Sequence, residues 1–148
     1  MKKTMALVMA SAALFGCQSM NSQQESSAQE AVYSQSVSLK SALWFNKMPT
    51  FGDNPEFNLH GSLVLEQKEG LPAELDIDRI TLHQGGDSYL LTADQFELRG
   101  HSESQWEIAF ALPIELSETL PVDVFVYFEQ EGNLSWVSEQ GVTVEVVY

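Results

Sequence analysis

The sequence predicts an all-β protein, whose folded domain is an antiparallel sandwich of two sheets with about eight strands. Apolar residues recur at every second position through most of residues 37–148, which is the period of a half-buried strand. Glycine, proline, asparagine and aspartate cluster between these runs, where turns are expected. No stretch has the sustained 3.6-residue period of an amphipathic helix.

Nine short runs carry this alternation. They are residues 37–45, 57–65, 80–82, 89–91, 96–98, 106–112, 122–128, 134–136 and 142–148. The run 106–112 is the clearest, because its large apolar residues all occupy even-numbered positions. The run 122–128 also carries Phe125 and Tyr127 on its second face. We therefore expect this strand to be central in its sheet and covered on both sides.

The segments between the runs read as turns and loops. Tight turns are expected at residues 84–87 and 131–133, because their Gly and Asn residues tolerate positive φ. Loops are expected at 48–56, 69–75 and 113–121, and the last of these could hold one helical turn. Strands at roughly ten-residue spacing resemble immunoglobulin-like sandwiches in rhythm. A small barrel is the alternative architecture.

The first residues have the pattern of an export signal. Lys2 and Lys3 precede an uncharged run, residues 5–15, which is too short for a transmembrane helix of about 20 residues. The run ends in LFGC at residues 14–17, and this stretch contains the only cysteine in the sequence. In that position LFGC resembles the lipobox of bacterial lipoproteins.

This resemblance implies that Cys17 is lipidated. In the family the signal is cut before the cysteine, the thiol receives diacylglycerol and the new amine is acylated. A single acyl chain binds a membrane only marginally, so several chains on one residue would make the anchor stable. Gln18, rather than aspartate, follows the cysteine. By the family's sorting pattern this implies the outer membrane of a Gram-negative cell, with the domain facing the periplasm; exposure on the cell exterior stays open.

The expected organisation has three parts. Residues 1–16 form the signal peptide, residues 17–36 contain the lipidated cysteine and a flexible Ser/Gln-rich tether, and residues 37–148 form the sandwich. The last part has the size of one domain with its own core. Because Cys17 carries lipid in this scheme, no disulfide is expected, and the domain depends on its core for stability.

The chain is strongly acidic, with a formal net charge of −14 at pH 7. Loss of Lys2 and Lys3 with the signal would leave 21 acidic and 5 basic residues and a charge of −16. Nucleic-acid binding depends on clustered Lys and Arg, so no nucleic-acid partner is expected. The acidic residues are scattered along the sequence, which is typical of a solvated surface. The alternative interpretation is that the acidic surface binds a basic partner.

No motif indicates catalysis, so we predict no catalytic residue and no cofactor, and we do not expect an enzyme. The sequence has neither a G-x-S-x-G motif nor a Gly-rich phosphate loop. His60, His83 and His101 lack the close spacing of metal motifs, so no metal site is predicted. Their convergence with Met48 on a copper ion stays open.

The sequence also contains aspartates that could form a calcium site. Asp76 and Asp78 share one face of an extended segment. Together with Asp53 or Asp87 they would offer the oxygen ligands that Ca²⁺ prefers. A solvated strand end is the simpler interpretation of these carboxylates.

The stretch at residues 43–51 is the best candidate for a partner surface. Parity turns Phe45 inward and Trp44 outward, and we expect Trp44, Met48 and Phe51 to form one cluster at an end or edge of the sandwich. Aromatic and Met side chains are enriched in interface cores, although the cluster could also seal the domain's own core. The expected function is a lipid-anchored binding or structural module with an envelope protein as partner. A small-ligand or copper-binding lipoprotein is the alternative.

Overall fold

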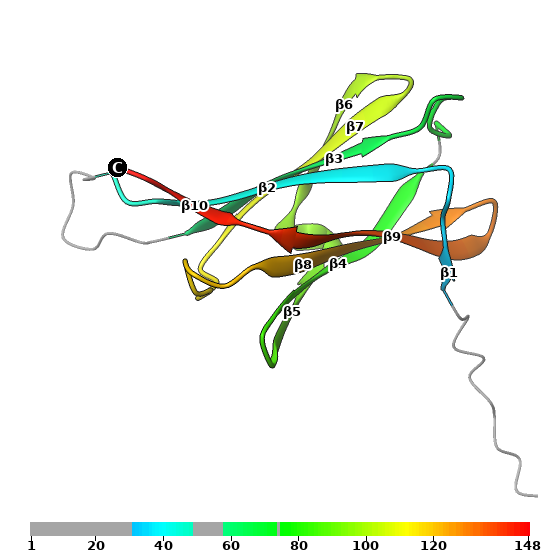
Figure 1. The fold of residues 1–148 in the computed structure, drawn as a ribbon. Helices are drawn as coiled ribbons and strands as arrows, with labels where there is room; N and C mark the ends of the chain where they lie inside the picture. The colour runs from blue at the N-terminus through cyan, green and yellow to red at the C-terminus, as the bar shows by residue number, and fades with distance from the viewer. Residues whose placement is uncertain (1–30, 49–57, 74) are drawn as a thin grey trace, which may run out of the picture.

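The computed structural model describes residues 31–48, 58–73 and 75–148 (Figure 1). Strands dominate this part of the chain, and its only helical element is one turn of 3-10 helix. The elements are β1 (Val32–Tyr33), β2 (Ser38–Asn46), β3 (Leu59–Glu66), β4 (Asp76–Gln84), β5 (Asp87–Thr92), η1 (Ala93–Gln95), β6 (Glu97–Ser102), β7 (Gln105–Leu112), β8 (Val122–Gln130), β9 (Asn133–Val142) and β10 (Val144–Val147).

The strands form two five-stranded sheets packed against each other, which confirms the predicted all-β sandwich. Sheet A has the order β1-β9-β8-β4-β5, and sheet B has the order β10-β2-β3-β7-β6. Neighbours are antiparallel, except that β1 pairs with β9 and β10 pairs with β2 in parallel. The described residues contain ten strands, rather than about eight.

The core lies between the sheets and follows the alternation of the sequence. Every second residue is buried along β3 and along most of β8. Leu63 and Ile108, for example, pair across β3 and β7 and are both 0% exposed. Full burial of such a side chain contributes about 1.5–3 kcal/mol to stability. The core therefore holds the domain together through packing.

In sheet B, a glycine makes room for a phenyl ring. Gly61 of β3 pairs with Leu43 on one side and with Phe110 on the other. A Cβ at Gly61 would lie 2.1 Å from Cζ of Phe110. The inward position at residue 61 is thus filled by the ring of Phe110, which is 6% exposed.

The chain passes from sheet A to sheet B between its last two strands, β9 and β10. The sequence predicts short strands at 134–136 and 142–148, but β9 is a single ten-residue strand of sheet A. A register shift on its pairing with β8 and a positive φ of 72° at Gly141 precede the passage to β10 in sheet B. Near this passage, a carboxylate oxygen of Glu139 accepts a hydrogen bond from the backbone N–H of Ser41 on β2.

The segment 113–121 forms no helical turn; the 3-10 turn η1 lies instead between β5 and β6. Side chains of sheet A satisfy backbone groups of this segment. The buried amide of Gln84 donates to the carbonyls of Ser117 and Leu120, at 2.8 Å each, and its oxygen accepts from the Ser117 N–H. The Tyr89 hydroxyl donates to the Glu115 carbonyl at 2.8 Å.

The sandwich begins inside the range 17–36 that the sequence assigns to a tether. Val32 and Tyr33 form β1, which adds to the edge of sheet A beside β9. The Ser34 N–H also donates to the carbonyl of Trp136 at 2.8 Å. The short β1 therefore leads the chain into the domain along sheet A.

Strand β8 is central in sheet A, as predicted, but no second layer of described residues covers its outer face. Phe125 and Tyr127 are half-buried there. Their neighbours are other rings and an arginine: Phe125 lies 5.7 Å from Trp136 between centroids, and the Arg79 guanidinium lies 4.1 Å from the Tyr127 centroid. The expected cover is therefore provided by side chains of the same face.

Candidate functional site

The outer face of sheet B carries the outward tryptophan that the sequence predicts. Trp44 of β2 pairs with His60 of β3, and His60 pairs with Ala111 of β7. Trp44 is half-buried, whereas Phe45 is 6% exposed within the core. The predicted parity of these two residues is confirmed. The rings of Trp44 and His60 stack with centroids 5.5 Å apart and planes 12° from parallel.

A groove of about 480 Å³ lies beside this stack, and we call it the Trp44 groove. Its lining includes Ala109 and Ala111 of β7, whose short side chains leave a hollow in the sheet surface. Residues 94–96, which lead from η1 into β6, form another part of its lining. The groove therefore spans from the stack on β2 and β3 across β7 to the start of β6.

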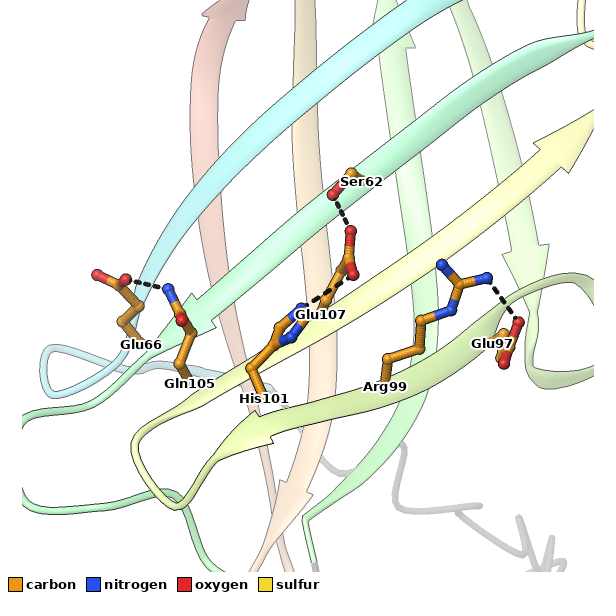
Figure 2. A network of polar contacts seen from close by, with 7 residues as sticks. All are labelled: Ser62, Glu66, Glu97, Arg99, His101, Gln105 and Glu107. Carbon is orange, nitrogen blue, oxygen red and sulfur yellow. Dashed lines mark hydrogen bonds and ion pairs between the residues drawn. The ribbon is translucent and has the colours of Figure 1, made fainter.

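A carboxylate lies at the centre of the polar contacts in the groove (Figure 2). One oxygen of Glu107 accepts a hydrogen bond from the Ser62 hydroxyl, and the other lies 3.0 Å from His101 Nε2. These two contacts, that of Ser62 first, hold the pKa of Glu107 below its ordinary value of 4.5. Glu107 is thus ionised at neutral pH.

Beside Glu107, Figure 2 also shows an ion pair on β6. Arg99 Nη2 lies 2.9 Å from an oxygen of Glu97. The hydrogen bond lowers the pKa of Glu97 and raises that of Arg99. At the neighbouring end of the face, the Gln105 amide donates to Glu66 at 2.6 Å. The outer face of sheet B therefore carries three separate groups of polar contacts, and Glu97, Arg99 and Glu107 from two of them line the Trp44 groove.

The order of Ser62, Glu107 and His101 differs from that of a hydrolase triad. In a triad the imidazole lies between the hydroxyl and the acid, so that it takes the hydroxyl proton. Here the carboxylate lies in the middle, and the Ser62 hydroxyl donates to it directly. The imidazole of His101 contacts only the far oxygen of the carboxylate. This arrangement orients Glu107, and it places a carboxylate rather than an imidazole against the Ser62 hydroxyl.

Of the two described residues of the predicted partner surface, Trp44 lines the groove and Met48 does not. Met48 follows β2 and is 49% exposed, and its backbone N–H donates to Asn46 Oδ1 at 3.0 Å. Phe51 and the predicted lipidation site Cys17 lie outside the described residues. The cluster of Trp44, Met48 and Phe51 stays a prediction.

The histidines do not converge on one point. His60 and His101 lie on the outer face of sheet B, but His83 lies on sheet A, where its ring contacts Phe125 at 5.2 Å. Within residues 31–48, 58–73 and 75–148, no group of three or more His, Cys, Asp or Glu side chains is placed to hold a metal ion. The copper hypothesis therefore has no geometric support from these residues.

The aspartates of the calcium hypothesis are also dispersed. Asp76 begins β4, whereas Asp87 begins β5 beyond the far end of β4, about 27 Å away along a nine-residue strand at ~3.3 Å per residue. Asp78 pairs instead with Arg79. Asp53 lies outside the described residues.

A second cavity, of about 800 Å³, lies at the end of the sandwich. The loop 67–73 and the β6–β7 hairpin line it, and Trp106 is the only tryptophan in its lining. Backbone bonds fix this frame, because the N–H groups of Gln67 and Leu71 donate to carbonyls of Ser104 and Glu103 at 3.0 and 2.7 Å. His101, which contacts Glu107, lines this cavity together with Glu69 and Glu103.

Sequence reasoning did not identify the groove itself. Its hollow comes from Ala109 and Ala111, which have the outward parity of a strand whose large residues all point inward. The sequence signal that could have predicted the groove is the pair of small outward residues on this strand, taken together with the outward Trp44 on β2. The contribution of residues 94–96 depends on how the chain passes from sheet A to sheet B, and no local pattern encodes it.

Comparisons with known proteins give no family for the chain: no protein-family model matches it, and no curated protein matches it significantly. Within the described part of the chain, no helix combines the length and hydropathy needed to cross a membrane. The geometry of the outer face of sheet B is therefore the main guide to function.

Proposed function

We propose that the chain is a lipid-anchored binding module of the bacterial envelope, and that the outer face of sheet B receives a protein partner at the Trp44 groove. One observation carries the binding half of this proposal. The Trp44–His60 stack borders a groove of about 480 Å³ on a sheet face that no second sheet or helix of described residues covers. Tryptophan beside a concave surface is typical of the residues that dominate binding energy.

The anchor half of the proposal rests on the sequence. LFGC at residues 14–17 ends a short apolar run behind Lys2 and Lys3, and its resemblance to a lipobox supports lipidation of Cys17. Placement at the outer membrane, facing the periplasm, is part of the same proposal and rests on Gln18. The tether between Cys17 and β1 would then give the domain freedom to meet a partner.

An immunoglobulin-like assignment of the sandwich belongs to this proposal as well. If β2 is strand A of such a domain, β2-β3-β7-β6 reads A-B-E-D and β9-β8-β4 reads G-F-C. Strand β5 then lies beside strand C, in the position of the extra strand that variable-type immunoglobulin domains add to this sheet. This agreement of strand order supports the assignment.

Site-specific photo-crosslinking in the native envelope tests the binding half. A photoreactive amino acid at Ala42, which is exposed on the outer face of β2 close to Trp44, should give a discrete crosslinked product. The same probe at Leu90, which is 57% exposed on sheet A, is the matched control and should not give this product. The Ala42 product should be lost in a Trp44→Ala background. Equal products from both positions, or a product that persists without Trp44, would contradict the proposal.

A further inference from the structure

We infer that the Trp44 groove binds a basic side chain of the partner, and that the planar guanidinium of an arginine is its best match. This inference rests on the proposed function, because it names the chemistry that the same site recognises. It draws on three independent properties of the groove: its shape, its charge and its aromatic wall.

The shape is that of a slot in a sheet surface. Ala109 and Ala111 form a low region, while Trp44 and His60 on one side and Phe96 on the other carry large rings. Side chains on one face of neighbouring strands are only about 4.5–5.5 Å apart, so two small residues between large ones leave space for one inserted side chain. The space is a shallow groove that is open to solvent and has large side chains along two sides.

The charge of the groove is negative. Asp94, Glu97 and Glu107 line it with Arg99 as the one fully basic residue, so two negative charges remain uncompensated when histidine is neutral. The Thr92 hydroxyl lowers the pKa of Asp94, Arg99 lowers that of Glu97, and Ser62 lowers that of Glu107. All three carboxylates are therefore ionised at neutral pH. Scattered acidic residues are typical of a solvated surface, but these three carboxylates all line the same groove.

The aromatic wall suits a planar cation. The Trp44 and His60 rings lie nearly parallel, and indole is the best aromatic partner for a cation. The domain already uses this contact elsewhere, because the Arg79 guanidinium lies over the ring of Tyr127 at 4.1 Å. Guanidinium stacks on rings and also forms paired hydrogen bonds with carboxylates, whereas ammonium acts as a point charge. Trp44 and the carboxylates that line the groove would supply these two kinds of contact to one inserted arginine.

Other ligand classes fit less well. An acidic side chain or a phosphate would be repelled by the uncompensated carboxylates. An apolar side chain would cover Glu107 and Asp94 without replacing their contacts with water, and such burial is costly. A basic side chain provides the missing charge and hydrogen-bond donors, and it is the one class that satisfies all three properties.

An NMR titration of the full-length chain in detergent micelles tests the inference. The probe is Nα-acetyl-arginine methylamide, and the readout is the indole N–H signal that disappears in Trp44→Phe. The arginine probe should shift this signal saturably, and added salt should weaken the effect. The matched norleucine and glutamate methylamides should not shift it. A response to norleucine as strong as that to arginine would overturn the inference.

Two variants separate shape from charge. Ala109→Leu fills the hollow without changing any charge and should abolish the shift, while Thr81→Leu on the outer face of sheet A should leave it unchanged. Glu107→Gln should weaken binding by about two- to fivefold, the effect of one exposed ion pair. Undiminished binding in Ala109→Leu would place the arginine elsewhere on the acidic surface and would overturn the assignment.

The titration and the crosslinking experiment fail in different ways. If the Ala42 crosslink depends on Trp44 but the arginine probe leaves the indole signal unmoved, the inference about the basic side chain is wrong and the proposed function stands. If the probe binds at Trp44 but no crosslink depends on that residue, the site for a guanidinium stands and the proposed protein partner is wrong.

Discussion

Gly61 and Phe110 share one position in the core of the sandwich. They pair across β3 and β7, and the ring of Phe110 lies where a side chain at residue 61 would begin. Gly61 does not have a positive φ, unlike Gly70, Gly85, Gly132 and Gly141. Backbone conformation therefore does not require glycine at this position; the close approach of the Phe110 ring does. The two residues therefore behave as one packing unit.

Gly61→Ala should destabilise the domain by about 1–3 kcal/mol or more, because the new Cβ would meet the Phe110 ring at 2.1 Å. Urea unfolding measures the change. Adding Phe110→Leu should recover part of the loss, since it removes the atoms that clash. Gly100→Ala is the control on an exposed strand, where a Cβ meets nothing within 4 Å. Equal effects at the two glycines would disprove the packing unit.

Ile108→Ala should cost about 2–5 kcal/mol, the usual range for truncating a fully buried large side chain. Ile108 is 0% exposed and pairs with Leu63 on β3. Ala111→Ser, on the exposed face of the same strand, should change stability by no more than about 0.5 kcal/mol. Similar losses for the two variants in chemical unfolding would show that the assigned parity of β7 is incorrect.

Trp44→Ala should reduce partner binding about thirtyfold, which corresponds to ~2 kcal/mol for a residue that dominates an interface. Its effect on stability should be smaller than that of Ile108→Ala, because Trp44 is only half-buried. Trp136→Ala provides a matched control, since Trp136 is a half-buried tryptophan of sheet A. Unfolding and binding are measured on both variants. Binding that falls equally in both would indicate a general loss of structure.

The stability contributed by Glu107 should depend on pH. Contacts with Ser62 and His101 lower its folded pKa below 4.5, so the unfolded chain binds this proton more readily than the folded chain. The contribution is therefore fully present above about pH 4.5 and is lost as pH falls through the folded pKa. The stability difference between the native chain and Glu107→Gln should shrink over this acidic range.

Ser62→Ala gives a direct check of the cause. Removing the hydroxyl that donates to Glu107 should raise the pKa of this carboxyl toward its ordinary value, which a carboxyl-detected NMR titration would measure. An unchanged titration midpoint in Ser62→Ala would contradict the assigned hydrogen bond.

Cys17→Ser should abolish metabolic labelling with a fatty-acid analogue and leave the precursor uncleaved. The expectation follows from LFGC at residues 14–17 and its resemblance to a lipobox. Ser19→Ala should retain labelling and cleavage. Detection uses a clickable palmitate and the mass of the mature chain; label that persists without the thiol would refute lipidation at Cys17.

Strand content could be predicted because inward parity repeats along single strands. The inward faces of β3 and β7 follow from the positions of residues such as Leu63 and Ile108, which are both fully buried. The turns at Gly85 and Gly132 were also predictable, because glycine tolerates positive φ. Both residues have positive φ in the structure. These features depend on neighbouring residues in the sequence, and local pattern is sufficient for them.

The remaining features depend on contacts between distant segments. The segment 113–121 is a loop, as predicted, but the amide of Gln84 from β4 holds it, so its own residues do not decide whether it contains a helical turn. Strand β1 has only two residues and is held mainly by β9. The Trp44 groove needs β2, β7 and the entry to β6 to come together. Such juxtapositions are set by topology, which a single sequence does not display.

The two parallel strand pairs have a mechanical consequence. β1 pairs with β9 and β2 pairs with β10, each with both strands running in the same direction. A pull that drew Ala31 and Tyr148 apart would slide the strands of each pair along one another, so the hydrogen bonds between them would share the force instead of opening one by one. Tension between these two ends would therefore load both seams along the strands, with four residue pairs in the seam of β2 and β10 and two in that of β1 and β9.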